Sequence, residues 1–264
     1  MPRGELNGWT YSYTDEGSGP ALIFNHGILM DRSIWDDQIE DLKDSYRCVA
    51  IDAPGHGEST PAAMGIDFYE YGDMLTAVAQ QLGIEQAVWL GQSMGGFINL
   101  RLALRHPDRV KGLVLIDTQA HSEDADKRAQ YEAFLKVSLE DGVGEDLANI
   151  LIMLLFGETF AGRPESDVWR KKLMTQDIEA RHAMVRAVFE RDDVHDRLGE
   201  IRVPAIVIHG REDVAIEPER AEELARDLPD ATVQFIDESG HCSPHERGAA
   251  VTKHVRTFLE RIGY

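Results

Sequence analysis

AVWLGQSMGG, residues 87–96, is the stretch that decides the fold of this chain. Its first four residues are apolar and predict a strand, and the glycines around Ser93 predict a sharp turn directly into a helix. The helical pattern continues from Phe97 to Leu104 and stops before Pro107, and a second apolar run ends at Asp117. Residues 87–117 are therefore expected to form a strand, a helix and a second, parallel strand.

Gly91 and Gly95 flank Ser93 in the pattern Gly-x-Ser-x-Gly, which marks a nucleophile elbow when a strand precedes it and a helix follows. Such a tight turn leaves no room for a Cβ two residues before or after the serine, and it holds the serine in a strained conformation that exposes Oγ. The helix that follows directs free N–H groups and its positive dipole end toward that oxygen. A Gly-Ser turn before a helix is also a common cap, so the assignment depends on partner residues downstream.

The composition excludes several classes of protein. The 264 residues, 43% hydrophobic and 28% charged, are enough for a sizeable core in one or two domains. A formal net charge of −20 disfavours nucleic acid and anionic membrane surfaces as partners. No apolar run approaches the ~20 residues of a membrane span. The first residues have no apolar signal core, and two cysteines, Cys48 and Cys242, are too few for a disulfide framework, so a cytoplasmic protein is expected.

Strand and helix patterns alternate at both ends of the chain and predict an α/β protein with a mostly parallel sheet. The turn residues 16–20 predict a hairpin between the first two strands. Outside 87–117, strands are expected at 9–13, 21–24, 47–52, 205–208 and 232–236, and helices at 33–42, 69–82, 218–228 and 249–262.

Residues 119–198 differ from the rest because they have no convincing strand pattern. They contain amphipathic helical segments, at 129–139, 145–156, 166–174 and 178–189. Helices inserted between the strands of a parallel sheet predict a separate cap over one sheet edge. The expected organisation is a core formed by 1–118 and 199–264, with a helical cap, or lid, at 119–198.

The order of three motifs resembles that of the α/β-hydrolase superfamily. Ser93 is followed by Asp213 in His209-Gly210-Arg211-Glu212-Asp213 and then by His241 in Glu238-Ser239-Gly240-His241. Each lies in a loop after a strand, and such loops open on the carboxyl edge of a parallel sheet. The resemblance implies the α/β-hydrolase fold, with helices on both faces of the sheet. The cap and the elbow resemble the branch of carboxylesterases and 3-oxoadipate enol-lactonases.

The resemblance also implies a role for each residue of the site. His241 would take the Oγ proton of Ser93 and pass it to the leaving group, and Asp213 would fix the imidazole tautomer. The backbone N–H groups of Met94 and of Ile28, which follows a His-Gly pair, would form the oxyanion hole. No cofactor and no metal are expected, because the sequence has no metal-ligand spacing and no complete phosphate-binding glycine loop.

Other residues compete for these roles. Asp117 and Glu212 are alternatives to Asp213 as the acid, although Asp213 has the commoner Gly-x-x-Asp spacing. The histidines near the motifs are given structural roles: His26 orients the oxyanion loop, His56 stabilises a turn, and His245 caps the last helix. Cys242 is interpreted as a small buried residue.

Apolar residues of the cap at helical spacings predict a mainly apolar pocket for an acyl or alkyl group, with Gly27, Trp35 and Trp169 among its walls. The expected function is hydrolysis of a small carboxylic ester or lactone through an acyl-enzyme on Ser93. An aspartate at the elbow, as in haloalkane dehalogenases and epoxide hydrolases, is lacking.

The alternatives that the sequence leaves open are a C–C bond hydrolase of ring-cleavage products, a cofactor-free perhydrolase and a hydrolase-like ligand receptor. The sequence also leaves the oligomeric state open, a homodimer included.

Overall fold

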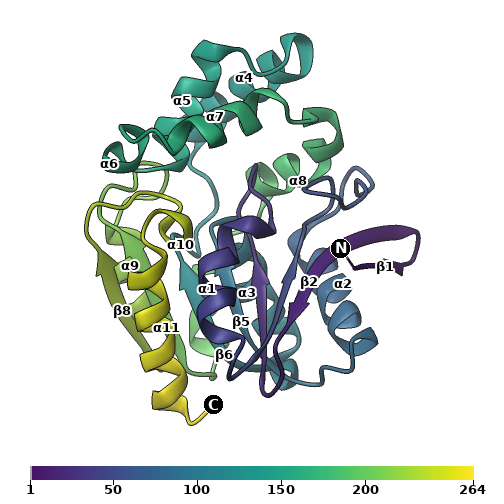
Figure 1. The fold of residues 1–264 in the computed structure, drawn as a ribbon, viewed down its shortest axis with the longest axis vertical. Coiled ribbons are helices and arrows are strands. Elements are labelled where there is room, and N and C mark those ends of the chain that lie inside the picture. The colour runs from purple at the N-terminus through teal and green to yellow at the C-terminus, as the bar shows by residue number, and fades with distance from the viewer. Residues whose placement is uncertain (1) are drawn as a thin grey trace.

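The computed structural model describes residues 2–264, which fold around one eight-stranded sheet with the order β1-β2-β4-β3-β5-β6-β7-β8 (Figure 1). The strands from β4 to β8 run parallel, and β1 and β2 pair antiparallel at one edge. The predicted α/β class with a mostly parallel sheet is confirmed. The strands are β1 (Arg3–Leu6), β2 (Trp9–Glu16), β3 (Ala21–Asn25), β4 (Arg47–Ile51), β5 (Ala87–Gln92), β6 (Val110–Ile116), β7 (Ala205–Gly210) and β8 (Ala231–Ile236).

The central strands are buried on both faces. Every residue of β3, β5 and β7 is buried, as expected for parallel strands that are covered by helices on each side. In Figure 1, α1 and α11 pack together in front of the sheet, and α2 and α3 pack together behind it. The core helices are α1 (Asp36–Leu42), α2 (Phe68–Gln81), α3 (Met94–Arg105), α9 (Glu219–Asp227), α10 (Ser243–Glu246) and α11 (Gly248–Ile262), with short 3-10 helices η1 (Arg32–Trp35), η2 (Pro107–Arg109) and η3 (His195–Glu200).

Five further helices lie between β6 and β7 in the chain, and Figure 1 shows them together above one end of the sheet. We call residues 125–190 the cap. Four of its helices lie where the sequence pattern predicts them, and the four-residue α6 was not predicted because one turn has too little periodicity to detect. The cap helices are α4 (Ala125–Asp141), α5 (Glu145–Leu155), α6 (Glu158–Ala161), α7 (Ser166–Met174) and α8 (Ile178–Glu190).

The predicted hairpin between the first two predicted strands is wrong. The turn is present, with positive φ at Gly17 and Gly19, but β4 lies between β2 and β3 and pairs with both. Local turn residues fix where a chain reverses, whereas the pairing depends on a strand that comes later in the sequence.

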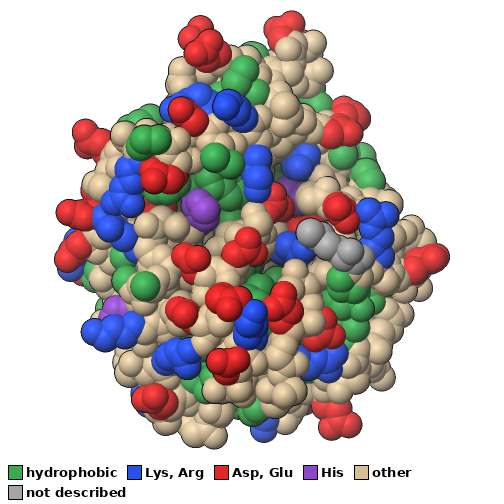
Figure 2. Space-filling view, viewed as in Figure 1, with side chains coloured by type: hydrophobic (Ala, Val, Ile, Leu, Met, Phe, Trp, Pro, Cys, Tyr) green, Lys and Arg blue, Asp and Glu red, His purple; other side chains and the backbone are tan. Residues whose placement is uncertain are grey.

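The surface and the cysteines agree with the composition. Figure 2 shows Asp and Glu side chains spread across the visible face, consistent with the net charge of −20. Cys48 and Cys242 are free and buried. Burial raises the pKa of the Cys48 thiol to about 12, which makes it a poor nucleophile. Within residues 2–264, no helix has both the length and the apolar content that crossing a membrane requires.

Candidate active site

Ser93 lies at the sharp turn between β5 and α3 with φ of 51° and ψ of −113°, a backbone conformation that is strained for any residue with a side chain. The two flanking glycines make this turn possible. A Cβ on Gly95 would lie 2.1 Å from the carbonyl oxygen of Asn25, and one on Gly91 would lie 2.5 Å from the backbone of Gly95. The close approach of β3, β5 and α3 therefore requires glycine at both positions.

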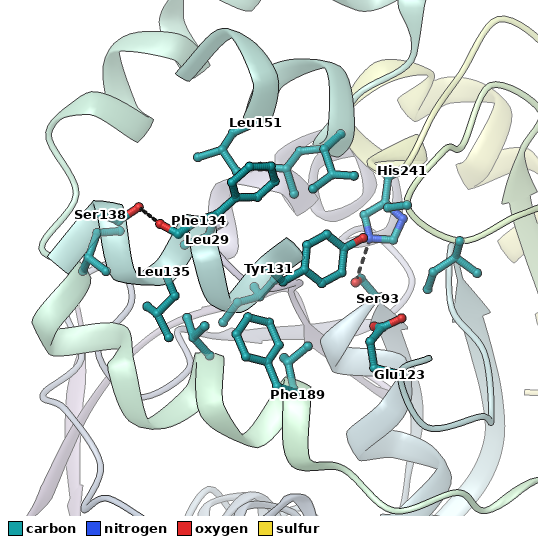
Figure 3. Close-up of a pocket in the computed structure, with 18 of the residues that line it drawn as sticks. Leu29, Ser93, Glu123, Tyr131, Phe134, Leu135, Ser138, Leu151, Phe189 and His241 are labelled. Atoms are coloured by element: carbon teal, nitrogen blue, oxygen red, sulfur yellow. Dashed lines mark hydrogen bonds between the residues drawn. The ribbon is translucent and has the colours of Figure 1, made fainter. Parts of the chain in front are cut away.

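The structure brings Ser93, Asp213 and His241 together from three separate loops. His241 Nε2 lies 2.8 Å from Ser93 Oγ, a contact drawn as a dashed line in Figure 3. His241 Nδ1 lies 2.8 Å from Asp213 Oδ2. The other carboxylate oxygen of Asp213 accepts the N–H groups of Ala215 and Ile216, both at 2.9 Å, so the carboxylate is held from two sides.

The charges of this group determine the tautomer of His241. Burial favours the neutral form of Asp213, but the neighbouring His241 and His209 outweigh it and lower the pKa of the carboxyl below its ordinary value. An ionised Asp213 can only accept, so His241 carries its proton on Nδ1 and leaves Nε2 free to accept from Ser93 Oγ. Burial lowers the pKa of His241, but the charge and hydrogen bond of Asp213 outweigh it and raise the pKa above its ordinary value.

His209, at the end of β7, is a second histidine on the same carboxylate. Its Nε2 lies 3.2 Å from Asp213 Oδ2 and 2.9 Å from the carbonyl oxygen of Ile216. Burial lowers the pKa of His209, and the hydrogen bond and charge of Asp213 outweigh it to raise the pKa to about 9. The sequence pattern did not indicate a role for His209, although it lies four residues before Asp213.

Asp117 and Glu212, the alternatives to Asp213, bind other partners than His241. Asp117 accepts from the backbone N–H of Gly210 at 2.9 Å and from the N–H and Oγ of Ser243 at 2.8 and 2.9 Å, so it ties the end of β7 to the His241 loop. Glu212 accepts from the N–H of Thr159 at 2.9 Å and holds α6 of the cap. Within residues 2–264, neither carboxylate forms a hydrogen bond with His241.

The backbone N–H groups of Ile28 and Met94 donate to no protein acceptor within residues 2–264. Met94 directly follows Ser93, and Ile28 lines the same pocket as Ser93. The loop that carries Ile28 is held by two neutral histidines, whose pKa values burial lowers. His26 Nδ1 donates to the carbonyl of Gly27 at 2.7 Å while its Nε2 accepts the N–H of Ala53 at 2.9 Å. His56 Nε2 accepts the N–H of the next loop residue, Leu29, at 3.3 Å. This geometry matches the orienting and structural roles expected for the two histidines.

Gln92 and Glu246 support the site in ways that the sequence did not indicate. Gln92 Nε2 donates to the carbonyl oxygen of His241, so the residue before the nucleophile contacts the loop that carries the base. Glu246 accepts the N–H groups of Gly240 at 2.9 Å, Gly157 at 3.0 Å and Cys242 at 3.0 Å. Its carboxylate therefore joins the His241 loop to the start of α6.

His245 was expected to cap the last helix, and the structure contradicts this. It lies within α10, a separate short helix, where its Nε2 accepts from Trp169 Nε1 at 2.8 Å. The break between α10 and α11 separates it from the N-terminus of the last helix.

An apolar pocket lies between Ser93 and the cap, with at most about 850 Å³ of atom-free space, which includes its opening to solvent. This upper limit suits a small molecule. In Figure 3, side chains of α4, α5 and α8 extend toward Ser93 and His241. The lining residues are Ile28, Leu29, Ser93, Phe97, Glu123, Tyr131, Phe134, Leu135, Ser138, Leu151, Leu154, Leu155, Ile178, Val185, Val188, Phe189, Ala215, Ile216 and His241.

The prediction that Gly27, Trp35 and Trp169 form the pocket wall is wrong, because none of them is among the lining residues. Trp35 is fully buried outside the pocket lining and packs on Phe24, with ring centroids 5.3 Å apart. Trp169 is also outside the pocket lining, and its ring packs against Phe156 and His245. Gly27 lies beside the nucleophile rather than in the pocket wall, because a Cβ on it would lie 3.2 Å from the Cβ of Ser93.

Comparisons with known proteins cover both the sheet and the cap. A family model described as alpha/beta hydrolase fold matches residues 20–247. A pimeloyl-(acyl-carrier protein) methyl ester esterase of Nitrosomonas europaea is 28% identical over 231 residues, which cover 85% of this chain and 90% of that protein. A thermophilic esterase from Thermogutta terrifontis superposes with a TM-score of 0.91 at 28% identity, over 99% of both chains. An enol-lactonase from Burkholderia xenovorans superposes with a TM-score of 0.90 at 26% identity, over 98% of this chain and 100% of the other.

Proposed function

Because the chain belongs to the alpha/beta hydrolase fold family, we propose that it is a serine hydrolase that cleaves a small carboxylic ester or lactone. One observation carries the proposal: His241 lies 2.8 Å from Ser93 Oγ on one side and 2.8 Å from Asp213 on the other. A serine hydroxyl is a weak nucleophile until an adjacent base accepts its proton, and this arrangement supplies that base. The similarity to an esterase and an enol-lactonase supports the choice of ester bonds.

In the proposed reaction, His241 Nε2 takes the Oγ proton while Ser93 Oγ attacks the carbonyl carbon. The carbonyl oxygen becomes an oxyanion that accepts from the N–H groups of Ile28 and Met94. When the tetrahedral intermediate collapses, the bond to the leaving oxygen breaks and His241 gives that oxygen its proton. Water, activated by the same histidine, then hydrolyses the acyl-enzyme. Asp213 stabilises the imidazolium in both steps.

The two outcomes of this chemistry differ only in the leaving group. With an ester, the alcohol leaves the site before water attacks. With a lactone, the alcohol stays attached to the acyl chain and the product is a hydroxy acid. The apolar side chains of the cap would hold the acyl or alkyl part, whose burial contributes binding free energy without directed hydrogen bonds.

The first prediction concerns pH. His241 must be neutral to act as a base, so kcat/KM should be retained above the pKa of His241 and lost as the pH falls through it. Since Asp213 raises this pKa above its ordinary value, the acid limb should have its midpoint above about 6.5. The measurement is kcat/KM for p-nitrophenyl butyrate between pH 5 and 9.

The unfolding temperature over the same range is the control for that profile, because burial raises the pKa of Glu246 to about 7 and its protonation falls in the same window. If kcat/KM falls at low pH while the unfolding temperature stays constant, the loss of activity is due to protonation of His241. A profile that stays flat down to pH 5 would remove His241 from the mechanism.

A second prediction concerns Gly27 next to the oxyanion N–H. A Cβ at this position would lie 2.1 Å from Gln92 Oε1, so Gly27→Ala should displace the Ile28 N–H or the Gln92 side chain that holds the His241 loop. We expect kcat to fall by about 10²–10³-fold, the loss typical of one oxyanion donor. Gly199→Ala is the matched control, since a Cβ there meets no atom within 4 Å. Wild-type kcat in Gly27→Ala would show that this loop does not stabilise the oxyanion.

A further inference from the structure

We propose that the pocket selects uncharged substrates and rejects esters whose acyl chain carries a carboxylate, and that Glu123 sets this selection. The inference rests on the proposed ester hydrolysis at Ser93 and adds the substrate class to it. It comes from the distribution of charge around an otherwise apolar cavity.

Few ionisable side chains line the pocket, and none of them is a lysine or arginine within the part of the chain that the structure describes. Besides His241 they are Glu123 and Tyr131, and Figure 3 shows both on the same side of the cavity as Ser93. A carboxylate on the substrate would lose its hydration in this cavity without gaining a cationic partner from the lining, which is costly.

Glu123 forms an ion pair with Arg191. Arg191 Nη1 lies 3.2 Å from Glu123 Oε2, and the two side chains are 0% and 9% exposed. The guanidinium is also held by the carbonyl oxygens of Val188 at 2.7 Å and His121 at 3.1 Å, and it stacks on the ring of Phe97 at 4.2 Å. Because Glu123 lines the pocket and Arg191 does not, the carboxylate of Glu123 is the charge of this pair that a ligand meets.

Tyr131 lines the same cavity, and its phenol responds to the charge of Glu123. After burial, the charge of Glu123 does most to raise the pKa of its phenol, followed by Asp213 and Glu217, and Arg191 opposes them. Glu123 is therefore the anionic neighbour that affects Tyr131 most. An anionic group nearby would be repelled, whereas a neutral or cationic group would not.

The test uses three methyl esters of similar length: methyl hexanoate, dimethyl adipate and monomethyl adipate. Dimethyl adipate has a polar but uncharged far end, so its comparison with monomethyl adipate isolates the charge. We expect kcat/KM for the monoanion to be lower by on the order of tenfold or more. The difference in kcat/KM between the two adipate esters should persist in about 0.5 M NaCl. At this ionic strength the exposed charges that produce the net −20 are screened, whereas a buried charge is screened much less.

Two variants test whether Glu123 causes the preference for uncharged esters. Glu123→Gln should lower the ratio of kcat/KM for dimethyl adipate to kcat/KM for monomethyl adipate by at least about threefold. Glu58→Gln also removes one negative charge, but Glu58 pairs with Arg3 at 3.1 Å on the exposed surface outside the lining, so the ratio should not change. An unchanged ratio in Glu123→Gln would overturn the assignment to Glu123.

Binding separates this inference from the proposed function. Ser93→Ala keeps the pocket, and saturation-transfer NMR of the esters with this variant measures selection without turnover. Preference for the neutral esters supports the inference even if no ester is hydrolysed, in which case the proposed function alone fails. Equal or better binding of monomethyl adipate would overturn the inference and would point to Arg191 Nη2, which has no acceptor within residues 2–264, as an anion-binding group.

Discussion

Replacement of Ser93 by alanine is expected to lower kcat for ester hydrolysis by about 10⁴-fold or more, because the substitution removes the atom that attacks the carbonyl carbon. The oxyanion N–H groups and the pocket remain, so a residual rate above that of water should persist. The measurement is the hydrolysis of p-nitrophenyl acetate and butyrate by matched preparations of the two proteins.

Ser138→Ala is the control for this substitution. Ser138 lines the same pocket and donates to the carbonyl of Phe134 at 2.8 Å, away from the His241 ring, so its hydroxyl takes no part in the proposed chemistry. We expect its kcat to stay within about threefold of wild type. Similar rates for wild type and Ser93→Ala would remove the serine mechanism and would favour a ligand receptor with incidental turnover.

Replacement of Asp213 by asparagine should lower kcat by about 10³–10⁴-fold. The amide oxygen would keep the N–H groups of Ala215 and Ile216, because only an acceptor fits there, and this places the NH₂ group toward His241. The imidazole would then carry its proton on Nε2 and could no longer accept from Ser93 Oγ. The loss should appear in kcat, with KM for a neutral ester changed little.

Glu212→Gln is the matched control for the acid. It removes a carboxylate from the adjacent position, and this carboxylate holds Thr159 of the cap rather than the imidazole. Its kcat should stay within a few fold of wild type. If Glu212→Gln lost as much activity as Asp213→Asn, the assignment of the acid to Asp213 would be wrong.

The fold was predictable because its signals are local. The Gly-x-Ser-x-Gly turn between a strand and a helix places Ser93, and strands that end near Asp213 and His241 place those loops at the same sheet edge. The positive φ of Ser93 also follows from the spacing of its glycines. The pairing of β4 between β2 and β3 was not predictable, because it joins segments whose patterns carry no information about each other.

The supporting residues were not predictable because their roles exist only in the folded chain. Nothing in the sequence distinguishes Glu246 from a surface glutamate, yet it accepts three backbone N–H groups around the His241 loop. Gln92 occupies an unspecified position of the elbow pattern, and its contact with His241 depends on a loop about 150 residues later in the chain.

The sequence predicted that the pocket would be apolar, but it did not identify the residues that line it. Helical periodicity gives the apolar face of a cap helix, but it does not say whether that face meets the core, another cap helix or the cavity. Trp35 packs in the core, and Trp169 packs against neighbouring aromatic rings. Both rings are buried, as is typical of large aromatic side chains, which bury much apolar surface. Glu123, which we propose selects the substrate, lies in a segment where the sequence predicted no element.

Ser93 should become covalently acylated during turnover, and rapid-quench mass spectrometry with p-nitrophenyl butyrate detects such an acyl group. We expect an intact-mass increase of one butyryl group that builds up before steady state, maps to the peptide that contains Ser93, and is absent from Ser93→Ala. Turnover of the ester by the wild-type protein with no acyl group on Ser93 at any quench time, and at the same rate in Ser93→Ala, would contradict it.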